Sequence, residues 1–272
     1  MSVTIEASGR RSVQTELDVV GTPEQVWQAI ATGPGISSWF VPTDIEERDG
    51  KPVAVTYHFA PGMDPRAEVT TWDPPRTFTQ QAEGWFPGSP PMAAEWTVEA
   101  RAGGTCVIRI VHSLFASTDE WDNQLEGAQS GWSGFLKTLR IYLAHFRGQP
   151  LALSQLRNPA TGTDAEIWSA MLSALKLANL RVGEPVEASA GVPPFRGVVE
   201  YLSDDPFDAL IRVTEPSPGI LALGVAGTPG GPSSVGVNLY KYGEHAEASL
   251  TRETPVWEAF LQARFPKSPD AG

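Results

Sequence analysis

The side chains best suited to acid–base or metal chemistry in this 272-residue chain are four histidines and one cysteine. No histidine has a second histidine or a cysteine at the spacing of metal ligands. The sequence also lacks a His-Glu-x-x-His pair, a Gly-x-Ser-x-Gly elbow and a phosphate-binding loop. From the motifs we therefore predict no catalytic residue, no metal site and no cofactor.

His112 is the histidine with the most informative position. It lies in a strand predicted over residues 105–115, where alternation puts Cys106, Ile108 and Ile110 on the same side. Facing an interior, His112 would orient a polar group of a ligand or exchange a proton near neutral pH. The alternative is a core histidine bonded to the backbone. Cys106 itself is predicted to be a small buried hydrophobe.

Aromatic residues give a stronger signal, because nine tryptophans require large buried surfaces or the walls of a cavity. Alternation directs Tyr57 and Trp96 to the apolar side of their strands. Residues 84–91 form a loop rich in proline and glycine, predicted to be either a gate or a surface loop. The predicted ligand-cavity residues are Trp39, Phe40, Tyr57, Trp85, Trp96, His112, Trp132, Phe135 and Leu136. Ordinary core packing is the alternative for each ring.

The elements that must position these residues follow a simple order. A strand over residues 11–20 precedes a helix that Thr22 would cap, and a short helical turn follows at residues 36–40. Apolar residues recur at three and four along a long helix predicted over residues 120–146. Between these helices, alternating segments predict an antiparallel meander over residues 53–59, 66–72, 77–82, 94–98 and 105–115. The long helix is predicted to cover the concave face of this sheet.

Several segments carry a family resemblance. They are Thr22–Ile30, Trp39–Pro42, Glu68–Arg76, Gly104-Thr105 before the strand that ends at His112-Ser113, and Gly131-Trp132 with Leu136 and Leu139. In this order they resemble the Hsp90-ATPase-activator-homologue (AHSA1-type) family of the SRPBCC, or START-like, superfamily, over residues 10–148. The resemblance implies an α+β helix-grip fold with an internal ligand cavity. It implies no single reaction, because the superfamily includes lipid carriers, hormone receptors, aromatase/cyclases and chaperone cofactors.

The second half of the sequence contains segments similar to segments of the first half. We predict a helix-grip domain over residues 1–150, a linker over 151–162 containing Asn158-Pro159, and a smaller α+β domain over 163–272. The last of these would be a reduced second helix-grip unit without its first strand, or an unrelated α+β extension. The similar segments are Asp164–Met171 with Pro23–Ile30, and Pro255–Arg264 with Gly131–Arg140.

The formal net charge of −12 makes nucleic acid and anionic membrane surfaces poor partners. The first eleven residues lack the apolar core of a signal peptide, and no run approaches the roughly 18 apolar residues of a spanning helix. We therefore expect a cytoplasmic protein. A homodimer or another protein partner is a further hypothesis.

Three functions follow as hypotheses. The first is binding of a small apolar or aromatic ligand in an internal cavity. The second is a cyclase- or aromatase-like enzyme acting on a hydrophobic substrate, which would need an inward histidine with a carboxylate or tyrosine nearby. The third is a protein-interaction module like a chaperone cofactor. The sequence leaves open whether the chain turns over a substrate.

Overall fold

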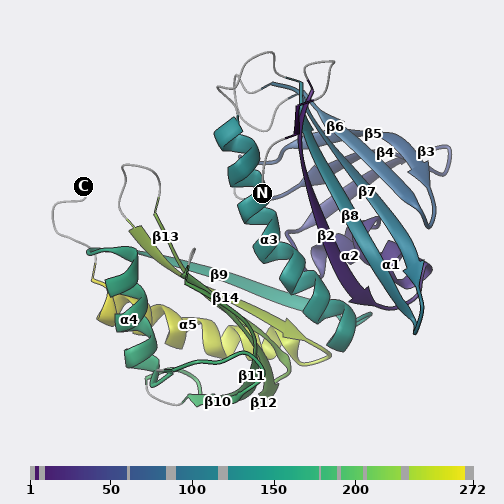
Figure 1. The fold of residues 1–272 in the computed structure, drawn as a ribbon. Coiled ribbons are helices and arrows are strands. Elements are labelled where there is room, and N and C mark those ends of the chain that lie inside the picture. The colour runs from purple at the N-terminus through teal and green to yellow at the C-terminus, as the bar shows by residue number, and fades with distance from the viewer. Residues whose placement is uncertain are drawn as a thin grey trace. The chain divides into compact units, whose positions relative to one another are not determined.

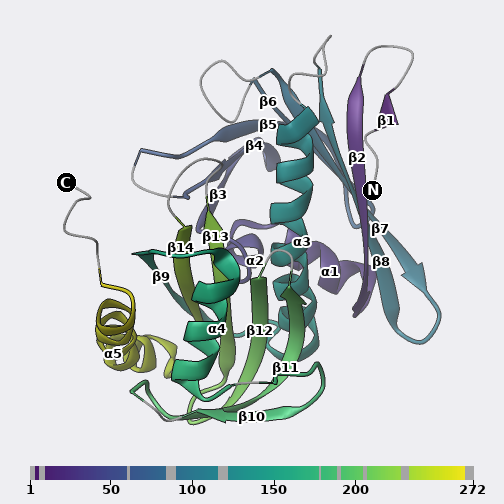
Figure 2. The ribbon, with the colours of Figure 1, turned by 60° about the vertical axis from the view of Figure 1, so that its left-hand side comes forward.

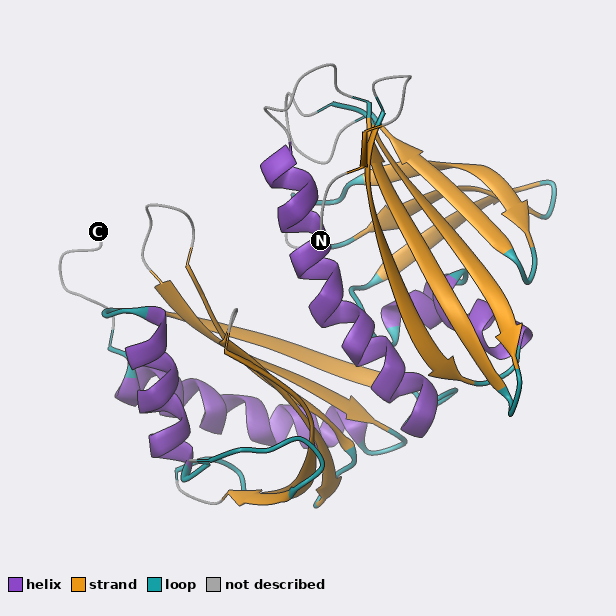
Figure 3. Cartoon of the chain, in the orientation of Figure 1, coloured by secondary structure: helices purple, strands orange, loops and turns teal. Residues whose placement is uncertain are grey.

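The chain divides into two compact units, Met1–Gly148 and Gln149–Gly272. The computed structural model describes residues 4–5, 10–59, 62–83, 90–115, 122–177, 179–188, 191–204, 207–227 and 233–266, and along helix α3 (Asp122–His145) it describes side chains from residue 134 onward. Figure 1 shows the labelled elements of both units, and Figure 3 separates their helices from their strands.

The first unit is an antiparallel sheet with three helices. Its strands are β1 (Thr4–Ile5), β2 (Arg11–Val20), β3 (Thr43–Arg48), β4 (Lys51–Tyr57), β5 (Arg66–Asp73), β6 (Thr77–Ala82), β7 (Met92–Arg101) and β8 (Thr105–Leu114). They are ordered β1-β2-β8-β7-β6-β5-β4-β3, so the early strand β2 lies beside the last strand β8. Helices α1 (Pro23–Ile30) and α2 (Gly33–Ser37) connect β2 to β3. The predicted helix-grip fold of this unit is confirmed.

The two short helices begin as their sequences dictate. The Thr22 side chain caps α1, as predicted. It forms a capping box with Gln25, and Pro23 occupies the first turn. Helix α2 begins at Gly33 under a cap from Thr32, three residues before the helical turn predicted at residues 36–40. A side chain on Gly35 would collide with the carbonyl group of Gln28, so only glycine fits this start.

Helix α3 lies along the concave side of the first sheet (Figure 2) and packs against β2 and β8. Its buried residues Leu136, Leu139 and Leu143 recur at intervals of three and four, which places them on one face of the helix, and Phe146 continues this spacing just after the helix ends. The helix therefore covers the sheet with the apolar stripe that the sequence predicts.

The second unit repeats this order on a smaller scale. Its elements are β9 (Leu151–Ala160), α4 (Asp164–Leu175), β10 (Pro185–Ala188), β11 (Phe195–Asp204), β12 (Phe207–Glu215), β13 (Gly219–Gly227), β14 (Ser233–Tyr242) and α5 (Ala246–Arg264). The sheet order is β10-β11-β12-β13-β14-β9, so β9 lies beside the last strand β14, as β2 lies beside β8 in the first unit. This unit is therefore a reduced α+β copy of the first, with one helix between its first strands in place of two.

The segment 151–162, which we predicted as a linker, is largely the strand β9, and the second unit does have its first strand. The turn-like pair Asn158-Pro159 suggested a connection. Within the described part of the sheet, β9 is an edge strand with β14 as its one neighbour, so a proline without an N–H group is tolerated there.

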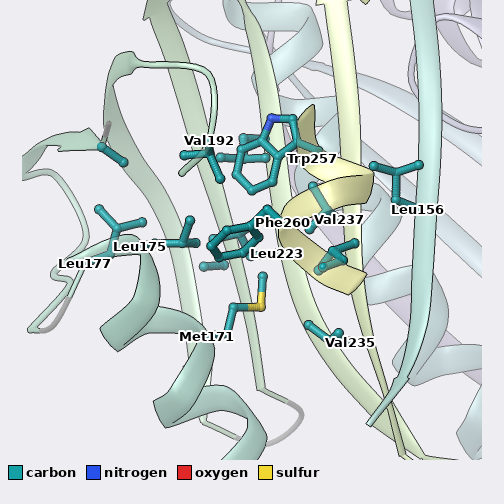
Figure 4. Close-up of a cluster of buried hydrophobic side chains, with 14 of the residues drawn as sticks. Leu156, Met171, Leu175, Leu177, Val192, Leu223, Val235, Val237, Trp257 and Phe260 are labelled. Carbon is teal, nitrogen blue, oxygen red and sulfur yellow. The ribbon is translucent and has the colours of Figure 1, made fainter. Parts of the chain in front are cut away.

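Figure 4 shows the core of the second unit, where helix and sheet residues meet. Met171 and Leu175 of α4 and Trp257 and Phe260 of α5 contribute to one cluster with strand residues such as Leu223. Both helices therefore cover the same face of this sheet. Among the described residues, no helix has the length and hydropathy needed to cross a membrane.

Candidate functional site

The candidate site is the inner face of the first sheet, under α3. The strand register aligns Val13 of β2, His112 of β8, Ala94 of β7 and Gln80 of β6 in one row across four neighbouring strands. Directly opposed residues of antiparallel strands point to the same side, and all four are buried. His112 and Gln80 therefore share the inner face, with only Ala94 between them in the row.

The next row on the same face is apolar. It contains Ile110, Trp96 and Phe78, which oppose one another on β8, β7 and β6 and are at most 3% exposed. On β4, Tyr57 is 3% exposed and shares the side of its strand with the fully buried Val55. The alternation that predicted Tyr57, Trp96 and His112 to point inward is confirmed.

Phe40 stands at the centre of the aromatic residues around this face. Its ring centroid lies 5.6 Å from that of Trp39, 5.9 Å from Tyr57, 5.5 Å from Phe59 and 4.5 Å from Phe135 of α3. Phe40, in the segment after α2, therefore contacts both the sheet and the helix that covers it. Trp39 is fixed in turn, because its Nε1 donates a hydrogen bond of 2.9 Å to the carbonyl oxygen of Ala29.

Polar groups on the inner face are buried and neutral. The Nε2 of Gln80 donates a hydrogen bond of 2.6 Å to the hydroxyl oxygen of Tyr57. Burial raises the pKa of Tyr57, although this hydrogen bond acts in the opposite direction. Burial also lowers the pKa of His112 to about 4, because the interior disfavours the imidazolium. Both side chains are therefore uncharged at neutral pH.

Comparison with known families bears on this unit. Residues 21–144 match the family model described as activator of Hsp90 ATPase homolog 1-like protein. The first unit belongs to this family. The matched residues run from the glycine before α1 into the last turn of α3, so they include every candidate residue of the inner face. We call this unit the activator-homologue domain.

The solved structures that resemble the chain match either about half of it or nearly all of it. The chain resembles CalU16 from Micromonospora echinospora (18% identity, 53% of this chain and 83% of that one, TM-score 0.41). It also resembles the Aha1 dimer from Colwellia psychrerythraea (22%, 48% and 95%, TM-score 0.40). The di-domain ARO/CYC BexL from the BE-7585A biosynthetic pathway matches nearly the whole chain (15%, 95% and 100%, TM-score 0.46). No curated protein matches the chain significantly.

The structure brings most of the predicted cavity residues together in the activator-homologue domain. Phe135 is half-buried and Leu136 is 2% exposed, both on α3. Trp85 and the side chain of Trp132 lie outside the described residues. The residues of the candidate site are thus Trp39, Phe40, Tyr57, Trp96, His112, Phe135 and Leu136, and contact with a ligand stays a prediction.

Gln80 is the site residue that the sequence analysis missed. It is 2% exposed and belongs to the inward set Phe78, Gln80 and Ala82 of β6. The sequence has two adjacent glutamines, Gln80 and Gln81, and only one of them can face inward. Side chains alternate along a strand, so Gln80 lies on the same face as the apolar Phe78 and Gln81 lies on the opposite face. This alternation with Phe78 was the sequence signal that could have identified Gln80.

Charged groups are absent from the described core of the activator-homologue domain, where no Asp, Glu, Lys or Arg is buried. Within the described part of the chain, no group of three or more His, Cys, Asp or Glu side chains is placed to hold a metal ion. Cys106 is fully buried and burial raises the pKa of its thiol, as suits the predicted small hydrophobe.

The side chain of His58 is 39% exposed and links three segments of the domain. Its Nδ1 lies 2.7 Å from Asp64 Oδ1 and its Nε2 lies 3.0 Å from Asp44 Oδ2. A protonated imidazole donates from both nitrogens, so the two carboxylates favour the charged form. The hydrogen bond with Asp64, followed by that with Asp44, raises the pKa of His58.

We expect the stability contributed by His58 to depend on pH. Because its folded pKa is raised, the contribution is fully present below the unfolded pKa of about 6.5 and is lost as pH rises through the folded pKa. In an NMR titration, Asp64→Asn should move the midpoint of His58 to lower pH. An unchanged midpoint would contradict the assigned cause.

Proposed function

We propose that the activator-homologue domain binds a small apolar or aromatic molecule between its concave sheet and α3. The observation that carries this proposal is the presence of three buried polar side chains, Tyr57, Gln80 and His112, on the face that also presents Trp96. The ring of Phe40 packs against Tyr57 from the segment after α2. A core that served packing alone would gain stability from apolar residues at these positions, because buried polar groups are costly.

The aromatic residues would supply most of the affinity. Apolar surface removed from water contributes about 25 cal/mol per Å², so a ligand that buries roughly 200 Å² against the rings gains about 5 kcal/mol before the costs of association. The buried polar groups would then set the orientation of the ligand. Both features belong to residues that the family model includes.

A screen of neutral aromatic compounds against the full chain tests this proposal. A compound at about 100 times its Kd should stabilise the activator-homologue domain by about 2.7 kcal/mol, which raises its melting midpoint by about 5–10 °C. Scanning calorimetry measures the shift, and titration calorimetry measures the Kd. Absence of stabilisation by every compound would contradict the proposal.

A matched pair of variants locates the site. Ala94 lies on the inner face between Gln80 and His112, so Ala94→Leu should weaken binding at least about tenfold by filling that space. Ala93 is its neighbour on the opposite side of β7, and Ala93→Leu should leave the Kd unchanged. Equal effects of the two variants would place the ligand elsewhere.

A cyclase- or aromatase-like activity is the alternative, favoured by the position of His112 on the same face as Tyr57. A histidine with a pKa of about 4 is a weak base at neutral pH, and no carboxylate is buried in the described part of this domain. Conversion of a bound compound into a product, abolished by His112→Ala, would favour this alternative over binding alone.

A further inference from the structure

Gln80 has one buried polar atom that nothing in the described protein satisfies. The side chain is 2% exposed, and its Nε2 is engaged by the hydroxyl oxygen of Tyr57 at 2.6 Å. Its Oε1 is buried and has no hydrogen-bond partner among the described residues. Buried acceptors without a donor are rare in native proteins, and each requires an explanation.

We propose that Oε1 of Gln80 accepts a hydrogen bond from the ligand, and that the ligand is a neutral aromatic molecule carrying a hydroxyl or N–H donor. This inference rests on the proposed function and specifies the class of molecule bound. A donor that reaches Oε1 removes the penalty of the unsatisfied acceptor, and an apolar molecule of the same shape does not.

The hydrogen bond with Tyr57 prepares Gln80 for this role. A glutamine amide has two ends, and fixing the Nε2 end restricts rotation of the whole group. The acceptor end is therefore held in one orientation before a ligand arrives, so little conformational entropy is lost on binding. Tyr57 acts here as a positioning residue for Gln80.

The surroundings of Gln80 select a neutral ligand. The described core of this domain contains no buried Asp, Glu, Lys or Arg that could balance a charge. The other polar side chain in the row, His112, stays uncharged at neutral pH because burial lowers its pKa to about 4. A carboxylate or ammonium group on the ligand would therefore enter the interior without a counter-charge, which costs more than a neutral donor does.

Three probes of nearly identical shape test the inference. Indole has an N–H donor, indene has neither donor nor acceptor, and benzofuran has a ring oxygen that can only accept. Titration calorimetry on the full chain should give a Kd for indole about tenfold lower than that for indene, a ratio typical of one satisfied buried acceptor. Benzofuran should bind no better than indene.

Two glutamine variants provide the control. Gln80→Met keeps the side-chain length and removes the acceptor, so indole should bind this variant no better than indene does. Gln81 is exposed on the opposite side of the same strand, and Gln81→Met should keep the tenfold ratio. Continued binding of indene to Gln80→Met would show that this variant is folded.

Three other results would each contradict the inference. Equal affinities of indole and indene for the unaltered chain would overturn the role of Gln80 and leave the proposed function standing. A preference for benzofuran over indole would show that the amide offers its N–H end, and would also overturn the inference. If none of the three probes binds at all, the proposed function fails and the inference fails with it.

Discussion

Replacing Lys241 by Met should lower the free energy of unfolding of the second unit by about 3–5 kcal/mol. Lys241 Nζ lies 2.6 Å from Glu253 Oε2, and the two side chains are 6% and 5% exposed. Without the lysine, the Glu253 carboxylate is left in the interior between β14 and α5. Arg252 approaches it at 3.6 Å, but this arginine is 64% exposed and solvent screens its charge.

Hydrogen exchange of the full chain, followed by mass spectrometry, measures this loss. Amides of β14 and α5 should lose protection in Lys241→Met, whereas those of β8 in the first unit serve as an internal reference. The double variant Lys241→Met/Glu253→Met should recover most of the stability, because no charge is then buried. Arg196 pairs with Glu187 at the surface, so Arg196→Met should cost less than about 1 kcal/mol. Full protection in Lys241→Met would refute the assigned role of the pair.

Replacing Phe40 by Ala should destabilise the activator-homologue domain by about 3–5 kcal/mol. The ring is 2% exposed, and it is the residue through which the rings of Trp39, Tyr57 and Phe135 meet. Its removal leaves a cavity between the sheet and α3, and the lost aromatic pairs add to the lost burial. The same variant should weaken binding of an aromatic ligand, because Phe40 belongs to the proposed site.

Urea denaturation, with hydrogen exchange of β7 and β8 as the probe specific to this domain, measures the effect. Phe115→Ala is the matched control, since Phe115 is 46% exposed and its truncation should change stability by no more than about 0.5 kcal/mol. Similar losses in the two variants would contradict the central position of Phe40.

Local patterns in the sequence predicted the elements that have strong periodicity. Alternation in β4, β7 and β8 gave the inward direction of Tyr57, Trp96 and His112, because side chains on a strand alternate strictly between its two sides. The cap at Thr22 gave the start of α1, since the groups that satisfy the first N–H groups of a helix are near in sequence.

Four strands were missed, β1, β3, β9 and β10, and two of them show that a strand can owe its stability to its neighbours. β3 (Thr43–Arg48) is largely exposed and rich in charge, and it lies at one edge of the described sheet, paired with β4. β9 occupies the corresponding edge of the second sheet and contains a proline. Edge strands tolerate charged residues and proline that central strands exclude. The sequences of these two segments therefore look like those of loops.

The sequence by itself therefore determined the helix-grip order and the inward direction of the rings and of His112, because each depends on periodicity within one element. Only the tertiary structure decided the pairing of Tyr57 with Gln80, since these residues lie on strands separated by β5 and a β-bulge in that strand shifts their register. It also decided the buried pair Lys241 and Glu253, which a strand and a helix bring together. Contacts between distant elements depend on sheet curvature and packing, and local sequence patterns carry no record of either.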